Sequence, residues 1–208
     1  MATTMLAFHG KNCFTHVVEK REVLARTACL ILQFQNLEGN YSTLMIEGEK
    51  NKDELEFPGG KVEGVDEDIY DTCFRETWEE VILGDIFPLE GNWHLEDWPA
   101  IRQKILSSDE QNQKLVSDIY KKLQNAPNVI YGSCPLKTIY FIVTISLAEA
   151  TTLINNHNLI PVSSGLLKTV ISNPGFTKKN TYIHTMEGDY RIRGRDFDGI
   201  YQYGSELL

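Results

Sequence analysis

The amino-acid sequence predicts an α/β fold. Strand-like segments stand on both sides of an acidic, amphipathic helical segment, and 42% of the 208 residues are hydrophobic. That share lies close to the average for globular proteins and is ample for one sizeable core. At roughly 150 residues per domain, the length favours a single domain over residues 1–208, enlarged by one insertion.

Four segments have the character of strands. Residues 23–34 form a long apolar run, and residues 41–47 alternate after a turn at Gly39, so the pair predicts a hairpin. Residues 55–57 form a short third strand that ends at Pro58-Gly59-Gly60, where the chain must bend or approach another group closely. Residues 136–147 are rich in β-branched and aromatic side chains, which predicts a buried strand.

The helical segments alternate with these strands. Residues 68–83 have a helical pattern, and Gly84 stands where a C-terminal cap belongs. Residues 98–124 form a second helical stretch, broken near Ser107-Ser108, and residues 148–156 form a short helix. Residues 162–171 fit a strand and a helix equally well.

The charge balance limits the classes of partner. Lysine and arginine total 20 against 29 aspartates and glutamates, a net charge of −9, which is unfavourable for nonspecific binding of nucleic acid or of an anionic membrane. The apolar runs are too short to span a bilayer, and the N-terminus lacks the pattern of a secretory signal. The 4 cysteines are widely spaced and contain no Cys-x-x-Cys pair, as expected of reduced thiols. We therefore expect a cytoplasmic protein.

The segment 68–83 gathers carboxylates on one side of its predicted helix. Glu76, Glu79 and Glu80 share an arc of about 100°, with Arg75 beside them. The other side would face a core and carries Tyr70, Cys73, Phe74, Thr77, Trp78 and Val81. Carboxylates this close repel one another; Arg75 can offset part of that by pairing with Glu79, and a hard cation such as Mg²⁺ the rest. A merely solvated acidic face explains this cluster equally well.

The wider spacing favours the metal site. The pattern Gly60-x6-Glu67-x7-Arg75-Glu76-x2-Glu79-Glu80 resembles the signature of the Nudix hydrolases, Gly-x5-Glu-x7-Arg-Glu-U-x-Glu-Glu-x-Gly-U, in which U is bulky and aliphatic. Six fixed positions would arise by chance on the order of 10⁻⁵ times per chain of this length. The sequence departs from the signature in one extra residue before Glu67, in Thr77 in place of U, and in Ile82 in place of glycine. All the carboxylates and the arginine are kept.

The resemblance implies an α/β/α sandwich around a mixed β-sheet, with residues 98–126 as a helical insertion. It also implies hydrolysis of a nucleoside diphosphate linked to another moiety, with Mg²⁺, or Mn²⁺ in its place, as the cofactor. The implied metal ligands are Glu76, Glu79, Glu80 and the carbonyl of Gly60. The implied metal would bind the pyrophosphate and lower the pKa of an attacking water.

The implied catalytic group consists of Glu67, Arg75, Glu76 and Glu79. Arg75 would orient the carboxylates, and Glu67 would be a supporting partner or a base. The sequence leaves open which glutamate accepts the proton. It also leaves open whether the substrate is a nucleoside triphosphate, a nucleotide sugar such as ADP-ribose, or a dinucleotide.

Residues outside the motif give weaker indications of the substrate site. Arg191, Arg193 and Arg195 would share one face of a strand and could bind phosphate, although a charged strand edge is the commoner role. A nucleobase could stack on Trp93, Trp98, Tyr140 or Phe141, although aromatic residues in strands more often fill a core. The helical insertion fits a lid, a homodimer contact or an exposed decoration.

Two other classes of function compete with an enzyme. One is a non-catalytic Nudix-fold module that senses a nucleotide or binds a protein; the three retained carboxylates argue against it, because a retired site has no reason to keep them. The other is a structural or interaction protein with a merely acidic helix, which Mg²⁺ would not stabilise against heat.

Overall fold

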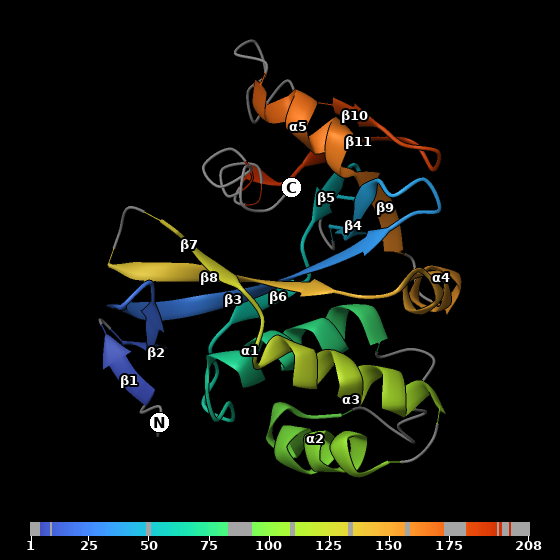
Figure 1. The fold of residues 1–208 in the computed structure, drawn as a ribbon. Helices are drawn as coiled ribbons and strands as arrows, with labels where there is room; N and C mark the ends of the chain where they lie inside the picture. The colour runs from blue at the N-terminus through green and yellow to red at the C-terminus, as the bar shows by residue number, and fades with distance from the viewer. Residues whose placement is uncertain are drawn as a thin grey trace. The chain divides into compact units, whose positions relative to one another are not determined.

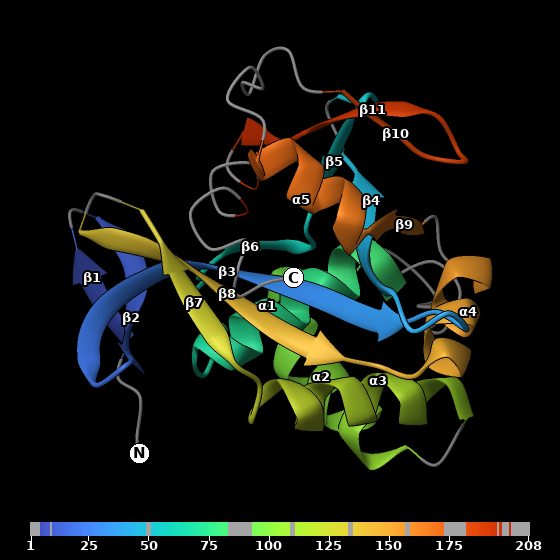
Figure 2. The same cartoon turned by 45° about the horizontal axis from the view of Figure 1, so that its top comes forward.

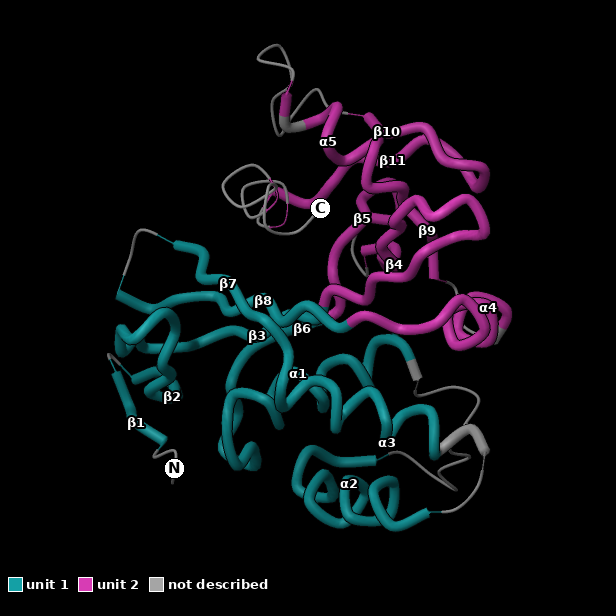
Figure 3. The backbone as a smooth tube through the Cα atoms, viewed as in Figure 1, with its two compact units in different colours: residues 1–30, 59–143 teal, residues 31–58, 144–208 magenta. Residues whose placement is uncertain are grey.

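The computed structural model describes residues 5–8, 10–48, 51–82, 93–108, 111–132, 135–156, 159–172, 182–194, 196 and 200 (Figure 1). The chain forms two compact units, residues 1–30 with 59–143 and residues 31–58 with 144–208 (Figure 3). Strand β3 (Arg21–Gln35) begins in the first unit and ends in the second. The single domain over residues 1–208 stays a prediction.

The strands of the first unit are joined mainly by antiparallel pairing. Strand β1 (Met5–Phe8) pairs with β2 (Lys11–Val18), and β2 pairs with the start of β3. The short strand β6 (Gly59–Lys61) also pairs with β3, with Gly59 opposite Cys29. Strand β8 (Leu136–Thr144) pairs with β3 and with β7 (Asn128–Tyr131). The β3–β6 register fixes where the chain enters the Gly-Gly segment.

The helices of the first unit lie in two layers on one side of these strands (Figures 1 and 2). Helix α1 (Ile69–Thr77) packs next to β6 and continues as a π-helical turn, η1 (Trp78–Ile82). The short 3-10 turn η2 (Leu95–Asp97) leads into α2 (Trp98–Ser107), and α3 (Gln111–Leu123) follows. Phe74 of α1 contacts the rings of Trp98 and Tyr120, with centroids 5.7 and 4.5 Å apart, so both outer helices rest on α1.

The second unit contains a parallel strand pair. Strand β4 (Tyr41–Glu47) pairs antiparallel with the end of β3, with β5 (Glu54–Glu56) and with β9 (Leu159–Ser163). Strand β11 (Asp189–Ile192) runs parallel to β5 and antiparallel to β10 (Tyr182–His184). Helices α4 (Leu147–Asn156) and α5 (Ser164–Ser172) complete this unit.

The predicted α/β class, with its mixed sheet and helical insertion, is confirmed. The hairpin of β3 and β4 forms at the predicted turn, and α2 ends at the predicted break, Ser107. The ambiguous segment 162–171 divides into the end of β9 and most of α5. Strands β1, β2, β6, β7 and β10 were not predicted from the sequence, and the predicted cap at Gly84 lies outside the described residues. Within the described part of the chain, no helix has the length and apolar character needed to cross a membrane.

Candidate active site

The two consecutive glycines allow two close approaches. Gly59 has a φ of +151°, and a Cβ atom there would lie 2.3 Å from the carbonyl oxygen of Ala28 on β3. A Cβ atom on Gly60 would lie 2.1 Å from Oε2 of Glu76. Any side chain at either position would therefore collide with the neighbouring strand or with the motif helix. The close approach predicted at Gly59-Gly60 is present.

Helix α1 is fixed at its start and buried on both sides. The side chain of Asp68 caps it, because Asp68 Oδ1 accepts a hydrogen bond of 2.7 Å from the backbone N–H of Asp71. The predicted apolar side is buried except for the half-buried Tyr70, but so are Ile69, Asp71 and Arg75, which lie outside it. The helix therefore lies inside the unit, with strands on one side and the helical insertion on the other.

The predicted uniform α-helix over residues 68–83 is wrong in its last turn. From Trp78 the chain adopts π-helical geometry, in which the hydrogen bonds span five residues instead of four. This turn holds Glu79 and Glu80, so their directions differ from those expected at 100° per residue. Glu80 is exposed and reaches back to β6, where its Oε2 accepts a hydrogen bond of 2.7 Å from the backbone N–H of Gly59.

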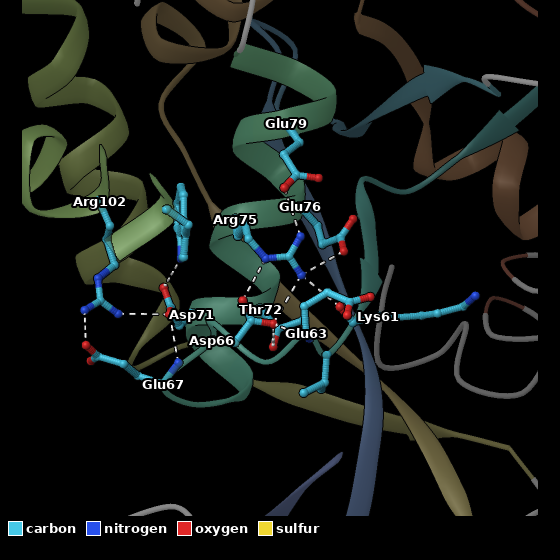
Figure 4. Close-up of polar contacts among 12 residues, drawn as sticks. Lys61, Glu63, Asp66, Glu67, Asp71, Thr72, Arg75, Glu76, Glu79 and Arg102 are labelled. Atoms are coloured by element: carbon cyan, nitrogen blue, oxygen red, sulfur yellow. Dashed lines mark hydrogen bonds and ion pairs between the residues drawn. The ribbon is translucent and has the colours of Figure 1, made fainter. Parts of the chain in front are cut away.

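Arg75 is the centre of the site (Figure 4). Its side chain is 2% exposed, and its guanidinium Nη2 donates to the carbonyl oxygen of Lys61 at 2.8 Å. Nη2 also lies 3.0 Å from Oε1 of Glu76, and Nη1 lies 2.9 Å from Oε1 of Glu79. The predicted ion pair between Arg75 and Glu79 is present. One buried cation thus joins the end of β6 to two carboxylates of the motif helix.

Asp66 accepts hydrogen bonds from the guanidinium of Arg75 on the side that Glu76 and Glu79 leave open. Its Oδ1 accepts a hydrogen bond of 2.7 Å from Arg75 Nε, and its Oδ2 accepts one of 3.1 Å from Arg75 Nη2. Asp66 Oδ2 also accepts hydrogen bonds from the backbone N–H of Glu63 at 2.8 Å and from Thr72 Oγ1 at 2.9 Å. Such a two-pronged pair is the strongest way in which a carboxylate can orient an arginine. The sequence analysis gave Asp66 no role.

Glu67 does not lie at this arginine. Its side chain is 68% exposed and pairs with Arg102 of α2. Counted from Gly60, Asp66 stands at the spacing of the signature's first acid; counted from Arg75, Glu67 does. The inserted residue therefore produced two candidates for one position. The structure brings Asp66 to Arg75 and leaves Glu67 outside the group of Glu76, Glu79 and Arg75.

The carboxylates of the site lie in a poorly hydrated place. Burial raises the pKa of Glu76 to about 7; Arg75 opposes the shift, and the charge of Glu79 adds to it. Burial also raises the pKa of Glu79, again opposed by Arg75. Burial works against the charge of Arg75, but its hydrogen bond to Asp66 and the charge of Glu76 outweigh it and raise the pKa of the guanidinium. The site therefore favours additional positive charge.

The chemistry of these side chains suits a hard divalent cation, although their arrangement does not by itself form a metal site. Glu76, Glu79 and Glu80 offer only oxygen donors, which Mg²⁺ prefers. Among the described residues, however, no group of three or more His, Cys, Asp or Glu side chains is arranged to hold a metal ion. Arg75 and the N–H of Gly59 take up the oxygens instead. A bound cation would have to draw these carboxylates together.

The residues proposed for substrate binding outside the motif have other partners. Arg191 pairs with Asp53 at 2.8 Å and Glu54 at 3.4 Å, and Arg193 pairs with Glu56, because β11 lies parallel to the acidic strand β5. The expected phosphate-binding face is therefore already neutralised at both arginines. Arg195 lies outside the described residues.

The proposed stacking aromatics are largely packed inside. Trp98, Tyr140 and Phe141 are fully buried, and Trp93 lies edge-on to Trp78, with ring centroids 5.4 Å apart. Packing is thus the role that the structure gives to these rings.

Comparison with known proteins gives a weak likeness in fold. No protein-family model and no curated protein matches the sequence. Among solved structures, the C. elegans Ap4A hydrolase is 16% identical with a TM-score of 0.35, over 71% of this chain and 84% of that chain. The M. smegmatis Nudix hydrolase RenU is 11% identical with a TM-score of 0.34, over 73% and 79%. A Nudix hydrolase from Alicyclobacillus acidocaldarius is 12% identical with a TM-score of 0.34, over 73% and 85%. Likeness at this level assigns neither a family nor an activity.

Proposed function

We propose that this protein is a Mg²⁺-dependent pyrophosphohydrolase of the Nudix type, which cleaves a nucleoside diphosphate linked to another moiety. One observation supports the proposal above the others. Glu76 and Glu79 of the motif contact the buried guanidinium of Arg75, and Glu80 accepts a hydrogen bond from the backbone N–H of Gly59, 21 positions away in the chain. A merely acidic helix has no need for a buried arginine that orients its carboxylates.

The metal would be held by Glu76, Glu79 and Glu80, with the carbonyl of Gly60 as a further candidate. When bound, a divalent cation neutralises charge on the pyrophosphate oxygens and makes an attacking water more acidic. The negative charge of these carboxylates would attract the cation. The protein carries a net charge of −9, and the bound cation would offset the local negative charge enough for an anionic substrate to bind.

The chain's own residues provide positioning. Arg75 contacts one carboxylate oxygen of Glu76 at 3.0 Å and one of Glu79 at 2.9 Å, so it keeps both groups on the same side of the helix, from which a cation could draw them together. Gly60 leaves room for Glu76 against β6, and Asp66 prevents the guanidinium from turning away. Phosphoryl transfer depends mainly on such positioning and on electrostatics, which a preorganised set of charges supplies.

A product screen with and without Mg²⁺ tests this function. Purified protein would be incubated with nucleoside triphosphates, nucleotide sugars, dinucleotides and inositol pyrophosphates, in Mg²⁺ or in EDTA, and the products separated by chromatography. We expect hydrolysis of at least one nucleotide class that EDTA abolishes. The class that turns over would identify the moiety linked to the nucleoside diphosphate.

Thermal melts of the same samples separate the competing functions. Stabilisation by Mg²⁺ without hydrolysis of any compound would indicate a nucleotide-sensing or protein-binding module. If Mg²⁺ neither stabilises the protein nor supports hydrolysis of any compound, the motif is merely an acidic helix and the proposal is overturned.

A further inference from the structure

A second buried aspartate, Asp71, joins the motif to the helical insertion. It lies in the first turn of α1 with its side chain fully buried, and its Oδ1 accepts a hydrogen bond of 2.9 Å from Trp98 Nε1. Its Oδ2 accepts one of 2.9 Å from the backbone N–H of Glu67 and lies 2.9 Å from Arg102 Nη1 (Figure 4). Two of these three donors belong to α2 and the third to the loop that precedes α1.

Arg102 bridges this aspartate and the loop. Its side chain is 13% exposed, and its guanidinium pairs with Asp71 through Nη1 and with Glu67 through Nη2. An exposed ion pair alone would contribute little. This arginine, however, also neutralises a carboxylate that is removed from water, where losing the partner leaves a buried charge.

The peptide bond between Asp66 and Glu67 connects the two aspartate–arginine pairs, Asp66–Arg75 and Asp71–Arg102. Asp66 is tied to Arg75 and to the backbone N–H of Glu63, whereas the next residue, Glu67, is tied through its backbone to Asp71 and through its side chain to Arg102. A shift of this peptide would loosen both pairs together. The position of Arg75 is therefore coupled to α2 over a single residue.

Helix α2 is seated on α1 by packing as well as by charge. The indole ring of Trp98 lies 5.7 Å from the ring centroids of both Phe74 and Trp78, and Ile101 and Ile105 are buried. An α2 that opened as a lid would have to expose Trp98 and leave Asp71 buried without its arginine. Breaking a buried ion pair in this way leaves an uncompensated charge away from water, which favours a permanent support over a lid.

We propose that α2 positions the candidate active site, with Arg102 as the positioning residue. Arg102, together with Trp98, fixes Asp71 and Glu67, and through the Asp66–Glu67 peptide it fixes Arg75 and the carboxylates that Arg75 holds. The insertion thereby supports the loop that precedes α1. The kinetic part of this inference rests on the proposed function, whereas its effect on the loop does not.

Arg102→Gln tests the proposal, with Lys121→Gln as its matched control. Both changes remove one positive charge from the insertion, but Arg102 pairs with the buried Asp71 and with Glu67, whereas Lys121 pairs with Asp118 on the surface of α3. Hydrogen exchange would be followed at the amides of Glu63 and Glu67, whose acceptors are Asp66 and Asp71. In Arg102→Gln we expect exchange of both amides to accelerate at least about tenfold, whereas Lys121→Gln should leave it unchanged.

The kinetic constants of the variants provide the second measurement. On the substrate found in the screen, kcat of Arg102→Gln should fall by about tenfold to a hundredfold, with KM changed by less than about threefold, because misplaced groups lose transition-state stabilisation more than binding. Arg102→Lys should restore part of the amide protection and part of kcat, since lysine supplies the positive charge but lacks the planar guanidinium that can pair with two carboxylates. If Arg102→Gln does not fold, Trp98→Phe, which removes the indole donor to Asp71 and keeps an aromatic ring against Phe74 and Trp78, takes its place in the same measurements.

The two proposals fail in different ways. Loop amides that stay protected in Arg102→Gln, or that lose protection equally in Lys121→Gln, would overturn the positioning role even if the wild-type protein is an active hydrolase. A wild-type protein without Mg²⁺-dependent turnover would overturn the proposed function, and the exchange measurement would still decide whether α2 supports the loop.

Discussion

Asp66 faces Arg75 with both carboxylate oxygens, at 2.7 Å from Nε and 3.1 Å from Nη2, while its neighbour Glu67 turns away to Arg102. Two consecutive acids thus serve two different arginines. The motif predicted Glu67 as a supporting partner or a base, but the acid that contacts Arg75 is Asp66.

Replacing these two acids separately tests that division. Asp66→Asn should lower kcat at least about tenfold more than Glu67→Gln does, because it removes the negative charge that neutralises the buried guanidinium of Arg75. It should also cost about 2–4 kcal/mol of unfolding free energy, less than a full unpaired charge because Glu76 and Glu79 still contact Arg75. Urea unfolding and Mg²⁺-dependent turnover of both variants would be compared. A larger loss in Glu67→Gln would return the catalytic role to Glu67.

Gly60→Ala should displace Glu76. A methyl group at Gly60 would lie 2.1 Å from the carboxylate oxygen of Glu76, so the side chain has to leave the position in which Arg75 holds it. We expect kcat to fall by about a hundredfold, in line with misplacement of a reacting group by about 1 Å. Gly64→Ala is the control, because nothing lies within 4 Å of the added atom at that position. Equal turnover of both variants would show that Glu76 has no part in the reaction.

Glu79→Gln should keep the fold and lose activity. The amide oxygen can still accept from Arg75 Nη1, now 2.9 Å from Oε1, but the charge that would attract Mg²⁺ is gone. We expect kcat to fall by about two orders of magnitude or more. The control is Glu22→Gln, which removes the same charge from an exposed site on β3. Undiminished Mg²⁺-dependent turnover in Glu79→Gln, with an unchanged melting temperature, would contradict the assignment.

The stability of the metal-free protein should depend on pH through Glu76. Because the folded protein raises the pKa of Glu76 to about 7, above its ordinary value, the protonated form favours folding. This contribution is complete below the unfolded pKa and is lost as the pH rises through about 7. Relative to Glu76→Gln, the wild type should lose on the order of 3 kcal/mol of unfolding free energy between pH 4 and pH 8.

Mg²⁺ should reverse this loss at pH 8 in the wild type and have a smaller effect in Glu76→Gln, because a cation stabilises the ionised carboxylate. Urea unfolding at several pH values, in Mg²⁺ or in EDTA, measures both effects. A difference between wild type and Glu76→Gln that does not vary with pH would show that Glu76 is ionised as easily as in water.

The sequence predicted the parts of the fold that depend on local patterns. Strand β4 begins and ends at the predicted residues, because it follows a turn at Gly39, whose φ of +82° favours glycine. Strand β6 escaped prediction because Gly59-Gly60-Lys61 has no strand character, and only its pairing with β3 makes it a strand. The π-helical turn escaped it too, because a helical residue pattern does not distinguish a four-residue from a five-residue hydrogen bond.

The site was predictable in its composition and in one of its ion pairs. Arg75 and its i,i+4 partner Glu79 follow from helix geometry alone. Asp66, in contrast, could be recognised only in three dimensions, because an inserted loop residue makes it and Glu67 equivalent in spacing. The contact of Arg102 with Asp71 joins residues far apart in the chain, and the pairing of Arg191 with Asp53 depends on a parallel register, so no local signal announces either.

The π-helical turn at Trp78–Ile82 sets a limit on how the length of this helix can vary during evolution. A turn with five-residue hydrogen bonds contains one residue more than the α-helical turn that would replace it. Loss of one residue from this turn would let the helix continue as an ordinary α-helix. Because Glu79 and Glu80 stand inside the turn, the change in hydrogen bonding would redirect their carboxylates relative to Arg75 and Gly59. The fold could therefore survive a deletion that the arrangement of these carboxylates would not.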